Sequence, residues 1–534
     1  MYLNRLQTHL SILAILIFGS IYNSFGQVPY AEVTFSSHFG GSGLEEFFGG
    51  TGASDGCYYM AGLSHSSDHD LMNTNIDSAN IFIVKVDDSG KKVWSRIYGG
   101  DDYDKARNIM EDDEGNLLFV GGTRSINGDI SYHRGGSDVF VGKIDDSGDL
   151  LWFKTYGGTS YEGGRDIIQT SDGGYLVVAY SSSIDMDVVN GGRGFHDGWI
   201  FKLDRDGNLV WSNTYGGSQV DRSRSAIELN DGSFIFTGQS NSDTLDCTGN
   251  HGSADVWAAR IDKDGNLLWS NLYGGAGVDR AYNIMQSSDG NFLISGHTKS
   301  GDITGKGGLM DYFDGLLIKI DEQGNVLKLE TFGGTYNEYF FRTKQLKDGK
   351  FIVAGSSSSH DNPVSGLDCK SGDSFMILQY DEDLNLDWGY CTGGSRSDIC
   401  NELIIDPDGQ IVLMGDSKSD NGTVPGNYGH YDYWIVGLKE LIASQQDPTG
   451  TAFSATYDAV NNNLRIESDS EQEVLITIYH ANGSSLQTKD ILLLQPGVNE
   501  YNISESAFKA AGLYIAKIEN IEYSSMVKFL YVKK

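Results

Sequence analysis

The chain has 534 residues, and its 39 Lys and Arg against 73 Asp and Glu give a formal net charge of −34. Glycine supplies 69 residues and proline only 6, while 39% of the chain is apolar. This composition excludes collagen and a disordered linker. The acidic balance argues against a nucleic-acid partner, because no basic stripe for phosphate contact stands out.

Residues 1–26 have the three parts of a secretory signal peptide. Arg5 precedes an apolar run from Leu10 to Ile21, and Ser24 and Gly26 are the small residues before cleavage after Gly26. The run is shorter than the roughly 20 apolar residues of a membrane-spanning helix. We therefore expect export to the periplasm and beyond, with no transmembrane segment in the mature chain.

An internal repeat organises residues 27–440. A Gly-Gly pair recurs at intervals of 58 to 60 residues, and an acid-Gly turn follows 16 residues after each. The first glycines of the seven pairs are Gly40, Gly99, Gly157, Gly216, Gly274, Gly333 and Gly393.

Each repeat predicts four short strands. In the second repeat these are residues 105–112, 116–121, 138–145 and 150–156, where apolar residues alternate between Gly and Asp turns. Seven such units are typical of a β-propeller. The seventh unit lacks its fourth strand, and residues 32–39 match that strand in pattern. We therefore predict that this N-terminal strand completes the last blade and closes the ring.

The eight tryptophans follow the repeat, which favours packing between blades over stacking on sugars. Five share one place in the fourth strand, and three lie near the start of the third. Lys328 stands where the fifth blade lacks its tryptophan. The eight are Trp94, Trp152, Trp211, Trp269 and Trp388, then Trp199, Trp257 and Trp434.

An acidic residue lies five places after the first glycine of every pair. We expect the seven to form a ring near one mouth of the channel, where each accepts N–H groups of the glycine turn. The alternative is a cation such as Ca²⁺ on the axis. This first acidic ring is Glu45, Asp104, Glu162, Asp221, Asp279, Glu338 and Asp398.

A second set of polar residues begins the third strand of each repeat. We expect these side chains to fasten the loop before them. The turn at residues 262–266 resembles the start of a calcium loop but lacks the downstream bidentate Glu. The second set is Asn80, Asp138, Asp197, Asp255, Asp314, Asp373 and Asp432.

The long loops between second and third strands share a face with the first acidic ring and form the expected binding face. They carry scattered histidines and tyrosines, which are also ordinary on a surface. These are His65, His69, His133, His196, His251, His360 and His430, with Tyr132, Tyr312, Tyr428 and Tyr431.

Five scattered cysteines form no disulfide framework or zinc motif. Cys391 and Cys400 are the nearest pair, but nothing in the sequence shows that they meet. There is also no HExxH, GxSxG or P-loop motif. The repeat hardly breaks, whereas an enzyme usually breaks its repeat at the active site. We therefore assign no catalytic residue and no certain cofactor.

The segment DVFVGKIDDSGDLLWFKTYGGTSYEGGRDIIQTSDGGYLVVAYSSS, residues 138–183, and its six relatives resemble the bacterial seven-bladed propeller repeat called SBBP. That resemblance implies the fold and no settled activity.

Residues 441–450 read as a linker, and residues 451–534 as a small β-sandwich. Residues 474–479, Asn482-Gly483 and 512–517 resemble the type A C-terminal sorting domain of the type IX secretion system of Bacteroidota. The family's early Tyr-Pro-Asn-Pro is here Tyr457-Asp-Ala-Val460. The resemblance implies the translocon and sortase of that system as partners. Without it, the alternating strands support an accessory domain, with a carbohydrate-binding or adhesive sandwich as the alternative.

The sequence thus predicts an all-β chain, with a closed seven-bladed propeller of four-stranded blades and a small C-terminal β-sandwich. We expect a secreted or surface-attached binding or adhesion protein without enzymatic activity, whose ligand is a glycan or a protein. The alternatives are an extracellular polysaccharide hydrolase or lyase, with a loop residue such as His196 in its site, and a calcium-dependent surface scaffold.

Overall fold

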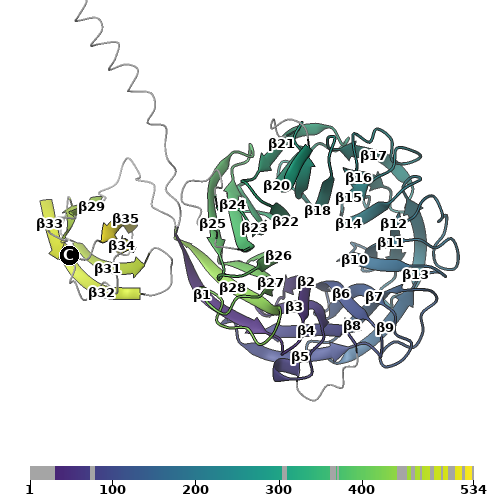
Figure 1. Ribbon diagram of the computed structural model, residues 1–534, viewed down its shortest axis with the longest axis horizontal. Coiled ribbons are helices and arrows are strands. Elements are labelled where there is room, and N and C mark those ends of the chain that lie inside the picture. The colour runs from purple at the N-terminus through teal and green to yellow at the C-terminus, as the bar shows by residue number, and fades with distance from the viewer. Residues whose placement is uncertain are drawn as a thin grey trace, which may run out of the picture.

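The computed structural model describes residues 30–441, apart from 72–77, 304–308, 361–368 and 370–371, and seven strands between 454 and 531. The predicted signal peptide and nearly all of the linker lie outside the described residues. Seven four-stranded antiparallel sheets stand around a central opening (Figure 1), so the predicted propeller is confirmed. No helix among these residues is long and apolar enough to cross a membrane.

The blades follow one another along the chain, and each runs from the channel outward. Their strands are β2 (Glu45–Gly52), β3 (Tyr58–Ser64), β4 (Asn80–Val86) and β5 (Lys92–Tyr98) in blade 1; β6 (Asp104–Glu111), β7 (Leu117–Thr123), β8 (Asp138–Ile144) and β9 (Leu150–Tyr156) in blade 2; β10 (Glu162–Gln169), β11 (Tyr175–Ser181), β12 (Asp197–Leu203) and β13 (Leu209–Tyr215) in blade 3; β14 (Asp221–Glu228), β15 (Phe234–Ser240), β16 (Asp255–Ile261) and β17 (Leu267–Tyr273) in blade 4.

The remaining blades continue the pattern. They comprise β18 (Asp279–Gln286), β19 (Phe292–Ser300), β20 (Leu309–Ile320) and β21 (Val326–Phe332) in blade 5; β22 (Glu338–Gln345), β23 (Phe351–Ser357), β24 (Ser374–Tyr380) and β25 (Leu386–Thr392) in blade 6; β26 (Asp398–Ile405), β27 (Ile411–Ser417), β28 (Asp432–Leu441) and β1 (Tyr30–Phe39) in blade 7. A short 3-10 turn, η1 (His69–Leu71), lies in the first long loop.

Strand β1 closes the ring as the sequence predicts. It pairs with β28 in antiparallel register from Tyr30 opposite Leu441 to Phe39 opposite Tyr433. The two strands lie side by side at the outer edge of blade 7, so the first and last strands of the ring share one sheet (Figure 1). Because β1 covers the edge that β28 would otherwise expose, hydrogen bonds between these two strands join the first and last strands of the ring.

Every inner strand contains a β-bulge at the same place. In β6 the pairing with β7 passes from Ala106 directly to Asn108, which leaves Arg107 as the extra residue. The same register shift follows the third residue of β2, β10, β14, β18, β22 and β26. A bulge re-aims its extra side chain and often lies beside a functional site.

The hydrophobic core lies between adjacent blades, as the tryptophans suggest. Trp199, Trp257 and Trp434 are fully buried. The outer Trp94 donates its Nε1–H to the carbonyl of Asp146 in the next blade, at 3.0 Å. Lys328, at the equivalent place in blade 5, donates to the carbonyl of Asp383. The lysine therefore keeps the polar contact between blades that tryptophan makes elsewhere.

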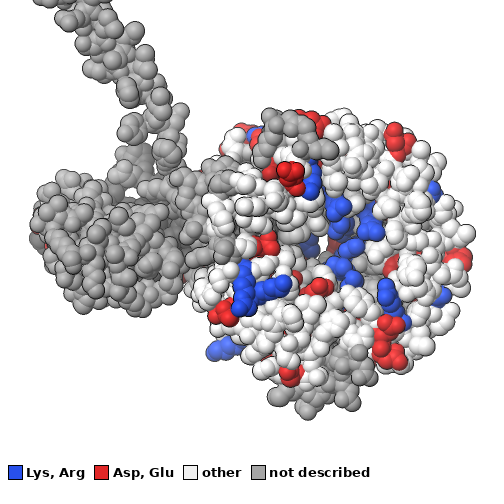
Figure 2. Space-filling model, viewed as in Figure 1, with Lys and Arg blue, Asp and Glu red and all other residues white. Residues whose placement is uncertain are grey.

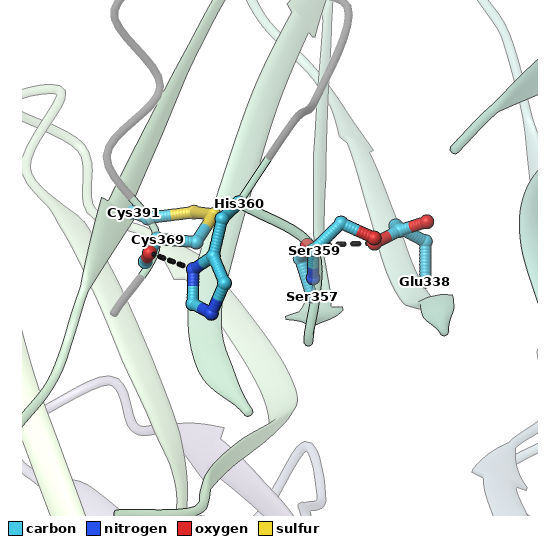
Figure 3. Close-up of a disulfide and its surroundings, with 6 residues drawn as sticks. All are labelled: Glu338, Ser357, Ser359, His360, Cys369 and Cys391. Carbon is cyan, nitrogen blue, oxygen red and sulfur yellow. Dashed lines mark hydrogen bonds between the residues drawn. A yellow bond between two sulfur atoms is a disulfide. The ribbon is translucent and has the colours of Figure 1, made fainter. Parts of the chain in front are cut away.

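A disulfide joins Cys369 to Cys391 within blade 6 (Figure 3). It ties the β23–β24 connection to β25, and His360 Nδ1 lies 2.9 Å from the carbonyl oxygen of Cys369. Cys400, the nearest partner for Cys391 in sequence, is buried without a disulfide, as is Cys247. The sequence alone did not reveal this pairing, because the two cysteines are 22 residues apart.

The C-terminal strands form two antiparallel sheets. One contains β29 (Ser454–Asp458), β30 (Asn463–Ser468) and β33 (Gly497–Asn502). The other contains β31 (Gln472–His480), β32 (Leu486–Leu494), β34 (Gly512–Glu519) and β35 (Ser524–Tyr531). These are the β elements that the alternating pattern of residues 451–534 predicts.

Candidate functional site

The first acidic ring is buried behind the channel wall. Each of its seven carboxylates accepts the N–H of the second glycine of its own pair, at 2.7–2.9 Å. Most also accept hydroxyl groups from the end of the second strand, as Glu45 does from Ser64 and Ser66 at 2.6 Å. The carboxylates therefore have protein partners that hold the glycine turn in place.

The second set lies between the blades, next to the first ring. Asp138, Asp197, Asp255 and Asp432 each accept a backbone N–H from four residues earlier, at 2.7–3.0 Å. Asp373 accepts hydroxyl groups from Ser358 and Ser397 instead, and Asn80 and Asp314 are buried at the equivalent places.

Burial and a facing carboxylate raise the pKa of several of these side chains. Burial is the larger cause for Asp138 and Asp197, whose pKa rises to about 6, and for Asp432, whose pKa rises to about 7. The nearby Glu162 acts in the same direction on Asp138. Each such contact crosses from the third strand of one blade to the inner strand of the next.

No group of three or more His, Cys, Asp or Glu among the described residues has a geometry that suits a metal ion. The calcium site on the axis stays a prediction. The turn at 262–266 uses Asp262 to accept the N–H groups of Asp264 and Asn266, at 2.9 and 2.8 Å.

The loop histidines do not converge on one site. His69 stacks on Tyr428 with ring centroids 4.2 Å apart, where blades 1 and 7 meet. His196 lies 2.8 Å from the Ser182 hydroxyl, and His251 pairs with Asp255 at 2.7 Å. His360 contacts the disulfide loop. The fully buried His297, which the sequence does not single out, packs among Tyr282, Phe313 and Tyr339.

The channel wall carries a cluster of positive charge. The acidic ring residues face into the blades, and because side chains alternate along a strand, the residues one and three places later face the channel. Figure 2 shows Lys and Arg side chains gathered around the central opening. We call six of them the channel cations: Lys105, Arg107, Arg165, Arg222, Arg224 and Arg280, from blades 2 to 5.

Aromatic rings hold these cations in place. The Arg107 guanidinium carbon lies 3.8 Å from the centroid of Phe48, and Arg224 lies 4.7 Å from Tyr282. Arg165 and Arg222 cover Tyr180 at 5.2 and 5.0 Å. The ring faces are thus occupied by cations, and their role is to orient the charged groups rather than to offer open stacking platforms.

Among the described residues, no carboxylate forms an ion pair with a channel cation. The arginine ion pairs of the described residues involve other side chains, such as Arg205 with Asp113 and Arg342 with Glu402. Within the same part of the chain, the buried Nε atoms of Arg165, Arg222, Arg224 and Arg280 have no hydrogen-bond partner. These side chains are partly exposed to the channel and have unused N–H donors, which leaves them available to a ligand.

Mutual repulsion and burial shift the pKa values of the cluster downward. Desolvation is the first cause and the neighbouring guanidinium groups are the next for Lys105, whose pKa falls to about 8. The same causes lower the pKa of Arg165 and Arg224 to about 10, with Tyr282 acting in the opposite direction on both. Perturbed groups that share a cavity are characteristic of functional sites.

A recess opens in the channel wall between blades 2 and 3. Its volume is about 90 Å³, and it forms where blade 3 has Gly163 in place of a channel-facing side chain. A Cβ at this glycine would lie 2.6 Å from the Tyr180 hydroxyl, so a larger residue would fill the space. The polar and charged residues around it are Tyr103, Lys105, Arg107, Thr123, Arg124, Ser137, Glu162, Arg165 and Tyr180.

The opposite side of the channel is less charged. Glu46 of blade 1 is the carboxylate that acts on Lys105 and Arg107. Asp416 of blade 7 accepts the Phe47 N–H, and its burial raises its pKa well above the usual range. The positive potential is therefore concentrated on blades 2 to 5.

The repeat pattern does not reveal this cluster. A basic cluster exists despite the acidic composition, and the channel-facing positions depart from the repeat. The signal was present: in blades 2 to 5, Lys or Arg stands one or three residues after the ring acid. In the other blades these places hold Glu46, Phe48, Tyr339, Phe341, Ile399 and Asn401.

No protein-family model and no curated protein matches the chain. Among solved structures, the Pan2 WD40 domain of Neurospora crassa gives 10% identity and a TM-score of 0.35 over 62% of this chain and 88% of that one. YCF48 bound to a D1 peptide gives 9% identity and a TM-score of 0.42 over 79% of this chain and 100% of that one. PorZ, a surface component of the type IX secretion system of Porphyromonas gingivalis, gives 10% identity and a TM-score of 0.31 over 94% of this chain and 75% of that one. Likeness at this level carries no argument about function.

Proposed function

We propose that this protein is an exported binding or adhesion protein whose ligand, a glycan or a protein, enters the central channel from the loop face. The propeller presents the site, and residues 451–534 serve as the sorting signal of a type IX secretion system. The mature protein is then secreted or attached to the outer surface.

Three observations support export. Residues 1–26 have the pattern of a signal peptide, and the tail resembles a sorting domain. The disulfide between Cys369 and Cys391 suits an oxidising compartment outside the cytoplasm.

The single observation that carries the binding site is the cluster of six channel cations, four of which have a buried Nε without a hydrogen-bond partner among the described residues. A rigid scaffold that holds such groups in a cavity keeps them ready for a ligand. The aromatic contacts fix their positions before binding, which lowers the entropy lost when a ligand arrives.

A ligand screen with a channel variant tests the proposal. The purified chain is applied to a glycan array and to immobilised proteins of the host surface, beside Arg222→Gln/Arg224→Gln. The matched control is Arg205→Gln/Lys263→Gln, which removes two charges from exposed turns at the hairpin ends of the blades. We expect a ligand that wild type and control bind and the channel variant loses. Absence of any ligand, or equal binding by the channel variant, would contradict the proposal.

A further inference from the structure

We propose that the recess between blades 2 and 3 is a subsite for one carboxylate or sulfate group, and that the ligand of the channel is an acidic glycan. This inference rests on the proposed function and names the ligand class of the same site.

Four cations line the recess. Lys105 and Arg107 come from β6, Arg165 comes from β10, and Arg124 follows the end of β7. Guanidinium groups bind carboxylate and sulfate through paired N–H donors, and an ammonium adds a point charge. An oxyanion in this position would neutralise groups that otherwise repel one another.

The surrounding structure makes the charges available to a ligand. Tyr103 lies under Lys105 and Arg124, with centroid distances of 5.0 and 5.9 Å. Tyr180 lies under Arg165 from the other side. Glu162, the carboxylate residue that also lines the recess, accepts the Gly158 N–H and the Ser181 hydroxyl at 2.9 and 2.8 Å.

The recess is large enough for one anionic group. Its volume of about 90 Å³ exceeds the roughly 10–15 Å³ of cavity volume that one water needs, so it has room for a carboxylate or a sulfate. The remainder of the ligand would lie in the channel, where Arg222, Arg224 and Arg280 continue the positive surface.

The chemistry of the wall favours a glycan over an acidic peptide. The channel cations of blades 2 to 5 are hydrogen-bond donors without acceptor capacity. A peptide inserted here would bring backbone N–H groups that also need acceptors, whereas an acidic glycan brings carboxylate, sulfate, ring and hydroxyl oxygens. The acidic outer surface has little effect on a ligand in the channel, because physiological salt screens charges that lie more than about 8 Å away.

Affinity measurements with defined polymers test the proposal. Titration calorimetry of the purified chain uses oligogalacturonate as the carboxylated probe, dextran sulfate as the sulfated probe, and neutral dextran and polyglutamate as comparisons. The recess variant is Arg107→Gln/Arg165→Gln, and the charge-matched control is Arg205→Gln/Lys263→Gln. We expect binding of at least one acidic glycan, weakened about tenfold or more in the recess variant and less than about twofold in the control.

Two further measurements keep the outcome interpretable. The melting temperature of the recess variant should equal or exceed that of wild type, because the substitution removes mutual repulsion. If the variant melts lower, Arg165→Lys provides a second comparison, because it keeps the charge and loses the paired N–H donors of the guanidinium. We expect this substitution to weaken binding of the acidic glycan as well.

The results separate this inference from the proposed function. Preferential binding of polyglutamate, or of neutral dextran, would overturn the assignment of an acidic glycan as the ligand, while the propeller would still be a binding protein. If the recess variant still binds the acidic glycan, the assignment of the recess as its subsite would be wrong. If neither acidic polymer binds while the screen above finds another channel ligand, the proposed function stands and this inference fails.

Discussion

The channel cations show how individual side chains depart from what folding favours. Lys105 and Arg165 both line the recess, and the charge of Arg165 helps to lower the pKa of Lys105. Elsewhere the structure pairs its buried charges, as Lys143 does with Asp112 at 2.7 Å. Because the same chain satisfies charges readily at other places, the unpaired ones in the channel call for a functional explanation.

Lys105 should make ligand binding depend on pH. Its pKa, lowered to about 8 by burial and by Arg107 and Arg165, means that the free site loses this charge as the pH rises through 8. Glu46 opposes the shift, and Arg124 adds to it. Since an anion favours the charged lysine, affinity for oligogalacturonate should fall between pH 7 and 9.5, by at most about tenfold per pH unit.

Calorimetry of wild type and Lys105→Gln across that pH range checks this prediction. The variant should bind more weakly at pH 7 and show little further change toward pH 9.5. A wild-type affinity that stays constant over the range would rule out the role of Lys105.

The carboxyl groups between blades predict a second pH effect, on stability. Burial and Glu162 raise the pKa of Asp138 to about 6 in the folded state, above its usual value near 3.9 when unfolded. Folding therefore favours the neutral form of Asp138. The stability that this preference contributes is complete below pH 4 and disappears as the pH rises through 6. Asp138→Asn should raise the free energy of unfolding at pH 8 by on the order of 1–3 kcal/mol, with little effect at pH 4.

Blade 1 supplies the matched control, because Asn80 already stands at this position beside Asp104. Asn80→Asp should lower stability at pH 8 more than at pH 4. Thermal unfolding of both variants at the two pH values measures the effect. Equal destabilisation by Asp138→Asn at both pH values would mean that hydrogen bonding, not charge, dominates there.

At the scale of single elements, the bulges and the glycine turns set the positions of the channel side chains. The bulge after the third residue of each inner strand leaves one extra residue, which is Arg107, Arg165 and Arg224 in three successive blades. The acid at the start of the strand holds the preceding glycine turn. The bulge and the glycine turn are thus the same in these blades, whereas the side chains that they place on the channel wall differ from blade to blade.

The disulfide of blade 6 replaces an apolar contact used elsewhere. Cys369 is buried in its loop, as Leu71 and Ile130 are buried in the loops of blades 1 and 2. The bond closes a segment of 22 residues, for which chain entropy predicts a stabilisation of roughly 3 kcal/mol. We therefore expect Cys369→Ser/Cys391→Ser to lower the melting temperature, and Cys247→Ser to change it much less.

Alkylation of the denatured, unreduced protein from an exporting host provides the direct check. Three thiols should react, from Cys57, Cys247 and Cys400. Modification of all five cysteines would show that the bond does not form in that compartment.

At the scale of the whole molecule, the sequence predicts the architecture because the architecture is periodic. The Gly-Gly pairs, the acid-Gly turns and the missing seventh outer strand together indicate a closed propeller, and the pairing of β1 with β28 confirms it. The two acidic sets are visible for the same reason. Their burial between blades follows from the three-dimensional closure of the ring, which no single repeat contains.

The channel cluster could not be identified from the periodic features, since it consists of residues that differ between repeats. Lys105, Gly163 and Arg222 occupy equivalent places and would look like ordinary variation. Their meaning depends on four consecutive blades facing one cavity. The net charge of −34 also conceals six positive side chains in that cavity. The disulfide likewise depends on how a loop folds back on its blade.

A crystal soaked in selenate gives the most direct test that the recess between blades 2 and 3 is an anion site. Selenate has the shape and charge of sulfate and is located by its anomalous scattering. We predict a peak in the recess, within hydrogen-bond distance of Arg107 and Arg165 and adjacent to Lys105 and Arg124. Peaks confined to the outer surface, with the recess empty at the same selenate concentration, would contradict the assignment.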